Sequence, residues 1–67
     1  MIAIQLNGDP HELSEGTTVV ELLESLGLRP EVCAVEIDRE LVPRSERSTR
    51  VLLDGQHVEV VTLVGGG

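Results

Sequence analysis

Alternating apolar and polar residues mark the start of the chain as a strand. Apolar side chains occupy every second position over residues 2–6, a period of two that predicts a half-buried strand. The sequence Asn7-Gly8 that follows is typical of a two-residue hairpin turn. Residues 10–13 are then expected to return as a second strand, with Pro10 at its first position, where no ladder hydrogen bond is needed.

The period changes to that of a helix over residues 18–26. Thr18 and Glu21 stand three positions apart, which is the spacing of a capping box at a helix N-terminus. Gly27 suits the position just past the last turn, and Pro30 prevents the helix from continuing. The apolar positions of this predicted helix are Val19, Leu22, Leu23 and Leu26.

Short strand patterns fill the rest of the chain. They are expected at residues 33–37, 40–42, 51–53 and 57–64, and the polar connection over 43–49 has room for one short helical turn. Strand pairs on either side of a single helix indicate an α+β fold of the β-grasp (ubiquitin-like) type, with a mixed four- to five-stranded sheet and one main helix on one face. Residues 1–64 would form this domain, and residues 65–67 a flexible C-terminal glycine tail.

One helix covers only one face of such a sheet, so the other face is expected to be partly bare. Strand alternation assigns each side chain to a face. The side chains expected to point at the helix are Ile2, Ile4, Val35, Ile37, Val58 and Val60. Those expected on the bare face are Ala3, Ala34, Val61 and Leu63, which would form a docking patch beside the tail.

Composition narrows the classes of function. The chain has 67 residues, a formal net charge of −7, no lysine and no aromatic residue. Nucleic acids and anionic membranes would repel it, and a base-reading surface would need stacking aromatic side chains and a net basic charge, neither of which it has. Its single cysteine, Cys33, excludes an internal disulfide. Together with the lack of a leader-like segment, this predicts a cytoplasmic location.

Side chains suited to catalysis are few. Cys33 lies on the apolar side of a predicted strand, which favours core packing over a reactive thiol. His11 and His57 come from separate strands with no ligand or base spacing, and no phosphate-binding glycine motif occurs. The remaining candidate is the terminal carboxylate of Gly67, because three glycines extend about 10 Å and pass through a channel too narrow for a Cβ.

The chain resembles the ThiS family of sulfur carrier proteins of thiamine biosynthesis over essentially its whole length. The resemblance rests on Thr17 to Leu23 followed by Leu26-Gly27, on Val35 to Arg44, on Leu53-Asp54-Gly55, on Val58 to Val61 and on Val64-Gly65-Gly66-Gly67. Departures from the family pattern occur at Asp38, near Arg47, where an aromatic residue is usual, and at Gln56. They leave the carrier role intact but put details of partner recognition in doubt.

This resemblance implies a set of partners. A ThiF-type adenylyltransferase would activate the carboxylate of Gly67 with ATP and Mg²⁺, and a cysteine desulfurase would supply sulfur to give a thiocarboxylate. Thiazole synthase, of the ThiG type, would then receive the sulfur. The chain itself would be no enzyme and would bind no cofactor. Its partner-binding residues would be Gly65, Gly66, Val64, Leu63 and Val61.

Three other functions stay open at this point. A small subunit of molybdopterin synthase also ends in two glycines, but such proteins are typically longer and carry aromatic and proline residues before them. A ubiquitin-like modifier is the second, although the absence of lysine prevents chains built on this protein itself. The third is a non-catalytic β-grasp binding module whose tail is inert.

Overall fold

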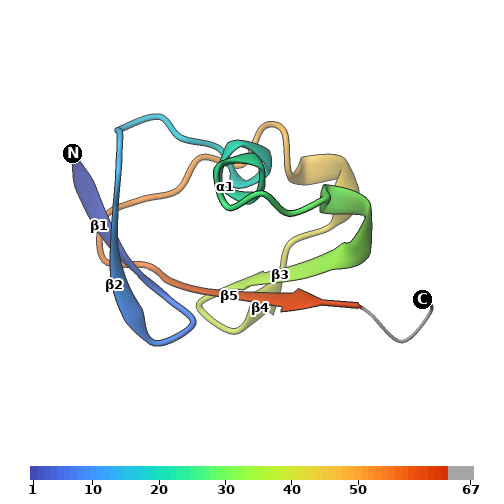
Figure 1. Ribbon diagram of the computed structural model, residues 1–67. Helices are drawn as coiled ribbons and strands as arrows, with labels where there is room; N and C mark the ends of the chain where they lie inside the picture. Colours follow the sequence, from blue (N-terminus) through green and yellow to red (C-terminus); the bar gives the residue numbers. More distant parts are fainter. Residues whose placement is uncertain (64–67) are drawn as a thin grey trace.

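Five strands form one sheet, and a single helix packs across it (Figure 1). The computed structural model describes residues 1–63 of the chain. In chain order the elements are β1 (Ile2–Leu6), β2 (Asp9–Leu13), α1 (Val19–Ser25), the 3₁₀ turn η1 (Pro30–Val32), β3 (Cys33–Ile37), β4 (Glu40–Leu41), the 3₁₀ turn η2 (Arg44–Glu46) and β5 (His57–Thr62). The predicted β-grasp architecture is confirmed.

The sheet has the strand order β2-β1-β5-β3-β4, so the last strand lies in the middle. β5 runs parallel to β1 and antiparallel to β3, while the two outer pairs are antiparallel hairpins. A parallel pair requires a crossover connection, and α1 lies in the chain segment between these two strands. Figure 1 shows α1 on one side of the sheet, with the other side uncovered.

Both hairpins turn on residues with positive φ. Asn7 and Gly8 have φ of 50° and 88°, and Asp38 and Arg39 have φ of 50° and 72°. Two consecutive residues in this region define the type I′ turn, whose twist matches that of the strands it joins. The hairpin predicted from Asn7-Gly8 is therefore confirmed, and the Asp38-Arg39 turn reverses the chain between β3 and β4.

Helix α1 begins and ends on the predicted caps. Thr18 is its N-cap, and both hydrogen bonds of the capping box with Glu21 are present. At the other end the Leu28 N–H donates to the Leu23 carbonyl and the Gly27 N–H to the Glu24 carbonyl, each at 3.0 Å. These two bonds form a Schellman motif, with Gly27 at φ 74°. Three of the four apolar positions of the predicted helix are buried, whereas the fourth, the C-cap residue Leu26, is 36% exposed.

The core lies between α1 and the covered face of the sheet. Its fully buried large side chains are Ile4, Val19, Leu22, Leu23, Val35, Ile37, Val42, Leu52 and Val58. Ile2 and Val60 pack against this core while only partly buried, so the assignment of all six strand residues to the helix side is confirmed. The core thus consists of aliphatic side chains and the buried thiol of Cys33.

The strand predicted at residues 51–53 does not form. Only Val51 makes a bridge, to Thr18, the N-cap residue of α1, and this bridge lies outside the five strands of the sheet. The segment instead covers the start of α1, where Val19 N–H donates to the Arg50 carbonyl and Leu52 N–H to the Thr17 carbonyl. Within residues 1–63, no helix is long or apolar enough to cross a membrane.

Candidate functional site

Strand β5 leads from the centre of the sheet to the C-terminal residues. Beyond it, the Leu63 N–H donates to the Val32 carbonyl at 2.6 Å, which fixes the end of β5 against η1. Val61 and Leu63 are exposed to 56% and 51% of their surface, as predicted for the bare face. Four predicted site residues, Val64, Gly65, Gly66 and Gly67, lie outside the described residues.

An asparagine holds the other edge of β5 where β1 has ended. The Asn7 side chain accepts a hydrogen bond from the Val60 N–H at 2.8 Å and donates to the Val60 carbonyl at 3.2 Å. One side-chain amide thus satisfies both backbone groups of a strand residue, as a neighbouring strand would. β5 is therefore held on both edges as far as Val60, three residues before the end of the described chain.

The uncovered face of the sheet carries both apolar and acidic side chains. Ala34 lies directly opposite Val61 in the β3–β5 ladder, and Glu36 lies directly opposite Glu59. All four point away from α1, because the intervening Val35 is fully buried. The structure thus confirms the predicted apolar residues on this face and adds two carboxylates, whose juxtaposition depends on a register that the sequence pattern does not fix.

The cysteine and the two histidines, which are the side chains best suited to catalysis or metal binding, lie in different parts of the domain. Cys33 is fully buried, and its thiol donates to the Arg29 carbonyl at 3.3 Å, which confirms its assignment to the core. His57 is exposed on β5, while His11 is partly buried on the outer strand β2. Among residues 1–63, no group of three His, Cys, Asp or Glu side chains could hold a metal ion.

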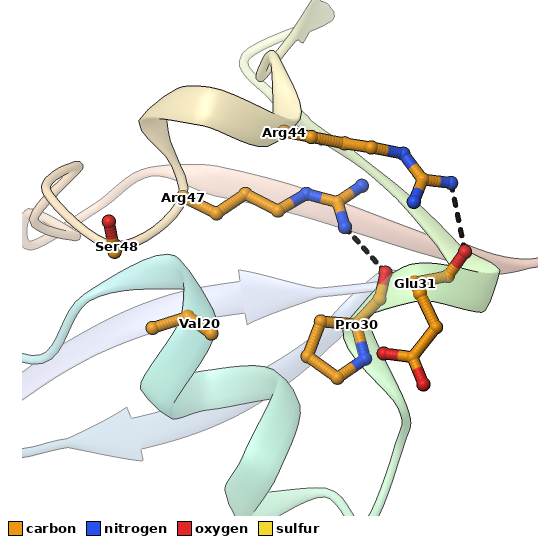
Figure 2. A pocket seen from close by; sticks show the side chains of 6 residues that line it. All are labelled: Val20, Pro30, Glu31, Arg44, Arg47 and Ser48. Atoms are coloured by element: carbon orange, nitrogen blue, oxygen red, sulfur yellow. Dashed lines mark hydrogen bonds between the residues drawn. The ribbon is translucent and has the colours of Figure 1, made fainter.

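A depression of about 260 Å³ lies between η1, η2 and α1. Figure 2 shows two arginines on its wall that reach the carbonyls of neighbouring residues: Arg47 donates to Pro30 at 2.6 Å and Arg44 to Glu31 at 2.9 Å. Arg47 also donates to the Cys33 carbonyl and is only 5% exposed. Both guanidinium groups therefore donate to backbone carbonyls of the fold, while the buried Nε of Arg47 has no hydrogen-bond partner among the described residues.

The burial of Arg47 is a feature that the sequence pattern does not indicate. The pattern predicts a polar connection over residues 43–49, whereas Arg47 within it is the one charged residue buried among residues 1–63. Its side chain contacts the interior of the domain, where it donates to the Cys33 carbonyl. A buried arginine carries no signal in hydrophobic periodicity, so this role was not predictable.

Comparison with known proteins gives a consistent result. A family model described as the ThiS family matches residues 4–67. The sulfur carrier protein ThiS of Thermus thermophilus is 42% identical over 64 residues, which cover 96% of this chain and 98% of that protein. The crystal structure of the thiamine biosynthesis protein ThiS from Geobacter metallireducens superimposes with a TM-score of 0.83 at 30% identity, covering 98% of this chain and 100% of that one.

One relative is much larger than this chain. A protein of Magnetococcus marinus named thiazole synthase is 44% identical over 64 residues, which are 96% of this chain but 20% of that protein. This chain thus spans about a fifth of its length. In that protein, a segment similar to this chain and the remainder of a thiazole synthase belong to one polypeptide.

Proposed function

This chain belongs to the ThiS family, and we propose that it is a sulfur carrier for the formation of the thiazole of thiamine, with the carboxylate of Gly67 as the sulfur-bearing group. The proposal is supported above all by its 42% identity to the Thermus sulfur carrier over 98% of that protein. The structure adds that β5 lies at the centre of the sheet, between β1 and β3, and that Leu63, the residue after the strand, is half exposed at the surface.

The proposed chemistry takes place in partner enzymes. The Gly67 carboxylate attacks the α-phosphorus of ATP in a ThiF-type adenylyltransferase, and pyrophosphate leaves. Mg²⁺ in that enzyme neutralises the phosphate charge, and enclosure in its site protects the acyl adenylate from water. The terminal sulfur of a persulfide formed by a cysteine desulfurase then attacks the acyl adenylate, and AMP leaves. A thiol such as cysteine reduces the S–S bond of the resulting acyl disulfide and releases the thiocarboxylate, which thiazole synthase consumes.

In this proposal the chain is a co-substrate and not an enzyme. Its own contribution is a stable body and an acyl end without side chains, while ATP, Mg²⁺ and the catalytic groups belong to the partners. The ordinary location of such a carrier would be the cytoplasm, which suits a chain whose single cysteine is a free, buried thiol. The fused Magnetococcus thiazole synthase supports thiazole synthase as the acceptor of the sulfur.

Intact-mass spectrometry tests the proposal directly. The purified chain is incubated with a ThiF-type enzyme, a cysteine desulfurase, cysteine, ATP and Mg²⁺. A mass gain equal to the replacement of one oxygen by sulfur is expected for the native sequence, and none for a variant without Gly67. The Glu24→Gln variant, altered on the exposed side of α1, is the matched control and should gain the same mass as the native chain. Equal sulfur loading of the variant without Gly67 would refute the assignment of the site.

A further inference from the structure

The turn between β1 and β2 consists of the dipeptide Asn7-Gly8, and Asn7 is the single asparagine of the chain. Both residues are exposed. In such a turn the backbone hydrogen bond joins the two flanking residues, here Leu6 and Asp9. The Gly8 N–H makes no hydrogen bond with any residue of the range 1–63, and no Cβ shields its nitrogen. This nitrogen is therefore open to reaction with the side chain that precedes it.

Asparagine is a thermolabile residue, and glycine after it permits a reaction that needs no enzyme. The backbone nitrogen of Gly8 attacks the side-chain carbonyl carbon of Asn7, which forms a new C–N bond and closes a five-membered succinimide ring. The bond from that carbon to Nδ2 breaks, and Nδ2 leaves as ammonia with the proton of the Gly8 N–H. Water then opens the ring on either side to give aspartate or isoaspartate at position 7. Water is the only co-reactant.

The folded structure opposes the first step by holding the Asn7 amide against β5. Oδ1 accepts from the Val60 N–H at 2.8 Å, and Nδ2 donates to the Val60 carbonyl at 3.2 Å. Because the two bonds hold both ends of a planar group, its carbon cannot rotate toward the Gly8 nitrogen while both remain. Detachment of this side chain breaks only these two bonds and leaves the ladder between β5 and β3 in place.

We propose that Asn7 is a site of spontaneous deamidation, and that the reaction starts from the state in which its side chain has detached from Val60. The two hydrogen bonds to Val60 then set the rate in the folded chain. The reaction involves only residues of the turn and of β5, so it is independent of the proposed carrier function.

The product cannot make the contacts of the native side chain. A carboxylate at position 7 has no N–H, so the Val60 carbonyl loses its donor and faces an anionic oxygen instead. Isoaspartate also adds one carbon atom to the backbone of the turn, which disturbs the hairpin. Either product adds a negative charge to a chain whose formal net charge is −7. Deamidation should therefore loosen the end of β5 and lower the melting temperature.

Peptide mass spectrometry follows the reaction at slightly alkaline pH, in the folded chain and in the chain unfolded by guanidinium chloride. The product is recognised by the replacement of an amide NH2 by OH at position 7, and fragment masses distinguish this from a change at Gln5. Breaking two hydrogen bonds should make the folded chain react about 5- to 150-fold more slowly than the unfolded chain. A short peptide of sequence Leu-Asn-Gly-Asp, measured in both buffers, corrects for the denaturant.

Thr18→Ala distinguishes local detachment of the side chain from unfolding of the whole domain. This variant removes the N-cap of α1 and leaves the Asn7-Gly8 turn unchanged. If the side chain detaches locally, the rate at Asn7 should stay within about twofold of the native rate. A rise of about fivefold, the effect of this cap on the unfolding equilibrium, would overturn local detachment.

The remaining outcomes are equally decisive. Equal rates in the folded and unfolded chains would refute control by the bonds to Val60. A folded chain more than about a thousandfold slower than the unfolded chain would overturn Asn7 as a reactive site of the native protein, since two hydrogen bonds cannot supply that factor. The product is isolated by anion exchange, and both it and the Asn7→Asp variant should melt below the native chain. Unchanged melting temperatures in both would overturn the predicted loosening of β5.

Discussion

Replacing Arg47 with alanine should severely destabilise the domain. The guanidinium donates to the Pro30 carbonyl at 2.6 Å and to the Cys33 carbonyl at 2.5 Å, and the residue is 5% exposed. Each carbonyl that loses its donor in a buried setting costs about 1–3 kcal/mol. Two such losses, together with the lost packing of the aliphatic stem, are only partly offset by relief from burying a charge that has no counterion.

Arg47→Ala should therefore lower the free energy of unfolding by about 3 kcal/mol, the net of these opposing contributions. A domain of this size has a free energy of unfolding of about 3–10 kcal/mol at the usual stability per residue. Since 1 kcal/mol corresponds to about 4–8 °C in a domain of 60–100 residues, the melting temperature should fall by about 12–24 °C. Thermal and urea unfolding followed by circular dichroism measure this change.

Two further variants separate packing from hydrogen bonding. Arg47→Met keeps most of the aliphatic stem but has no donors, so it should be intermediate between the native chain and Arg47→Ala. Arg50→Ala is the control, because Arg50 forms a 3.8 Å ion pair with Glu46 while 38% of its side chain is exposed. Such a pair contributes about 0–1 kcal/mol. If Arg47→Ala unfolded at the same temperature as Arg50→Ala, the structural role of the guanidinium would be refuted.

Three smaller changes test other parts of the fold. Thr18→Ala removes the N-cap of α1 and should cost about 1 kcal/mol in urea unfolding. Gly27→Ala should lower the free energy of unfolding by about 1 kcal/mol, because alanine disfavours a φ of 74°. The added Cβ meets no atom within 4 Å, so backbone conformation is the only cause. An unchanged midpoint of urea unfolding would contradict this. Asn7→Gly keeps the hairpin turn but removes both side-chain bonds to Val60, so the Val60 amide should exchange with solvent faster while the Ile4 amide stays protected.

Local features of this fold were predictable from the sequence because their causes are local. The caps of α1 at Thr18 and Gly27 and the turn at Asn7-Gly8 depend on residue types within a few positions of each other. The alternation of β3 and β5 assigned Val35 and Val58 to the covered face, as the structure confirms. In each case the residues that determine the feature lie within a few positions of one another in the chain.

Features that depend on distant pairing were not predictable. The sequence around Val51 has a strand pattern, but in the fold Val51 bridges Thr18 at the start of α1 instead of joining the sheet, and that contact is with a residue more than thirty positions away in the chain. Arg47 is buried because η2 brings it over the carbonyls of Pro30 and Cys33, and nothing in its own segment indicates that contact. The pairing of Glu36 with Glu59 likewise requires a register that joins two strands over twenty residues apart in the chain.

Neighbouring side chains of β5 point to opposite faces of the sheet, so some of them pack in the core and others lie on the uncovered surface. Val58 is buried in the core, so its truncation should reduce the free energy of unfolding. Glu59 and Val61 point to the uncovered face, where a substitution changes what a partner contacts while the core stays packed. Substitutions on the uncovered face therefore change what this surface presents to other molecules while the fold is retained.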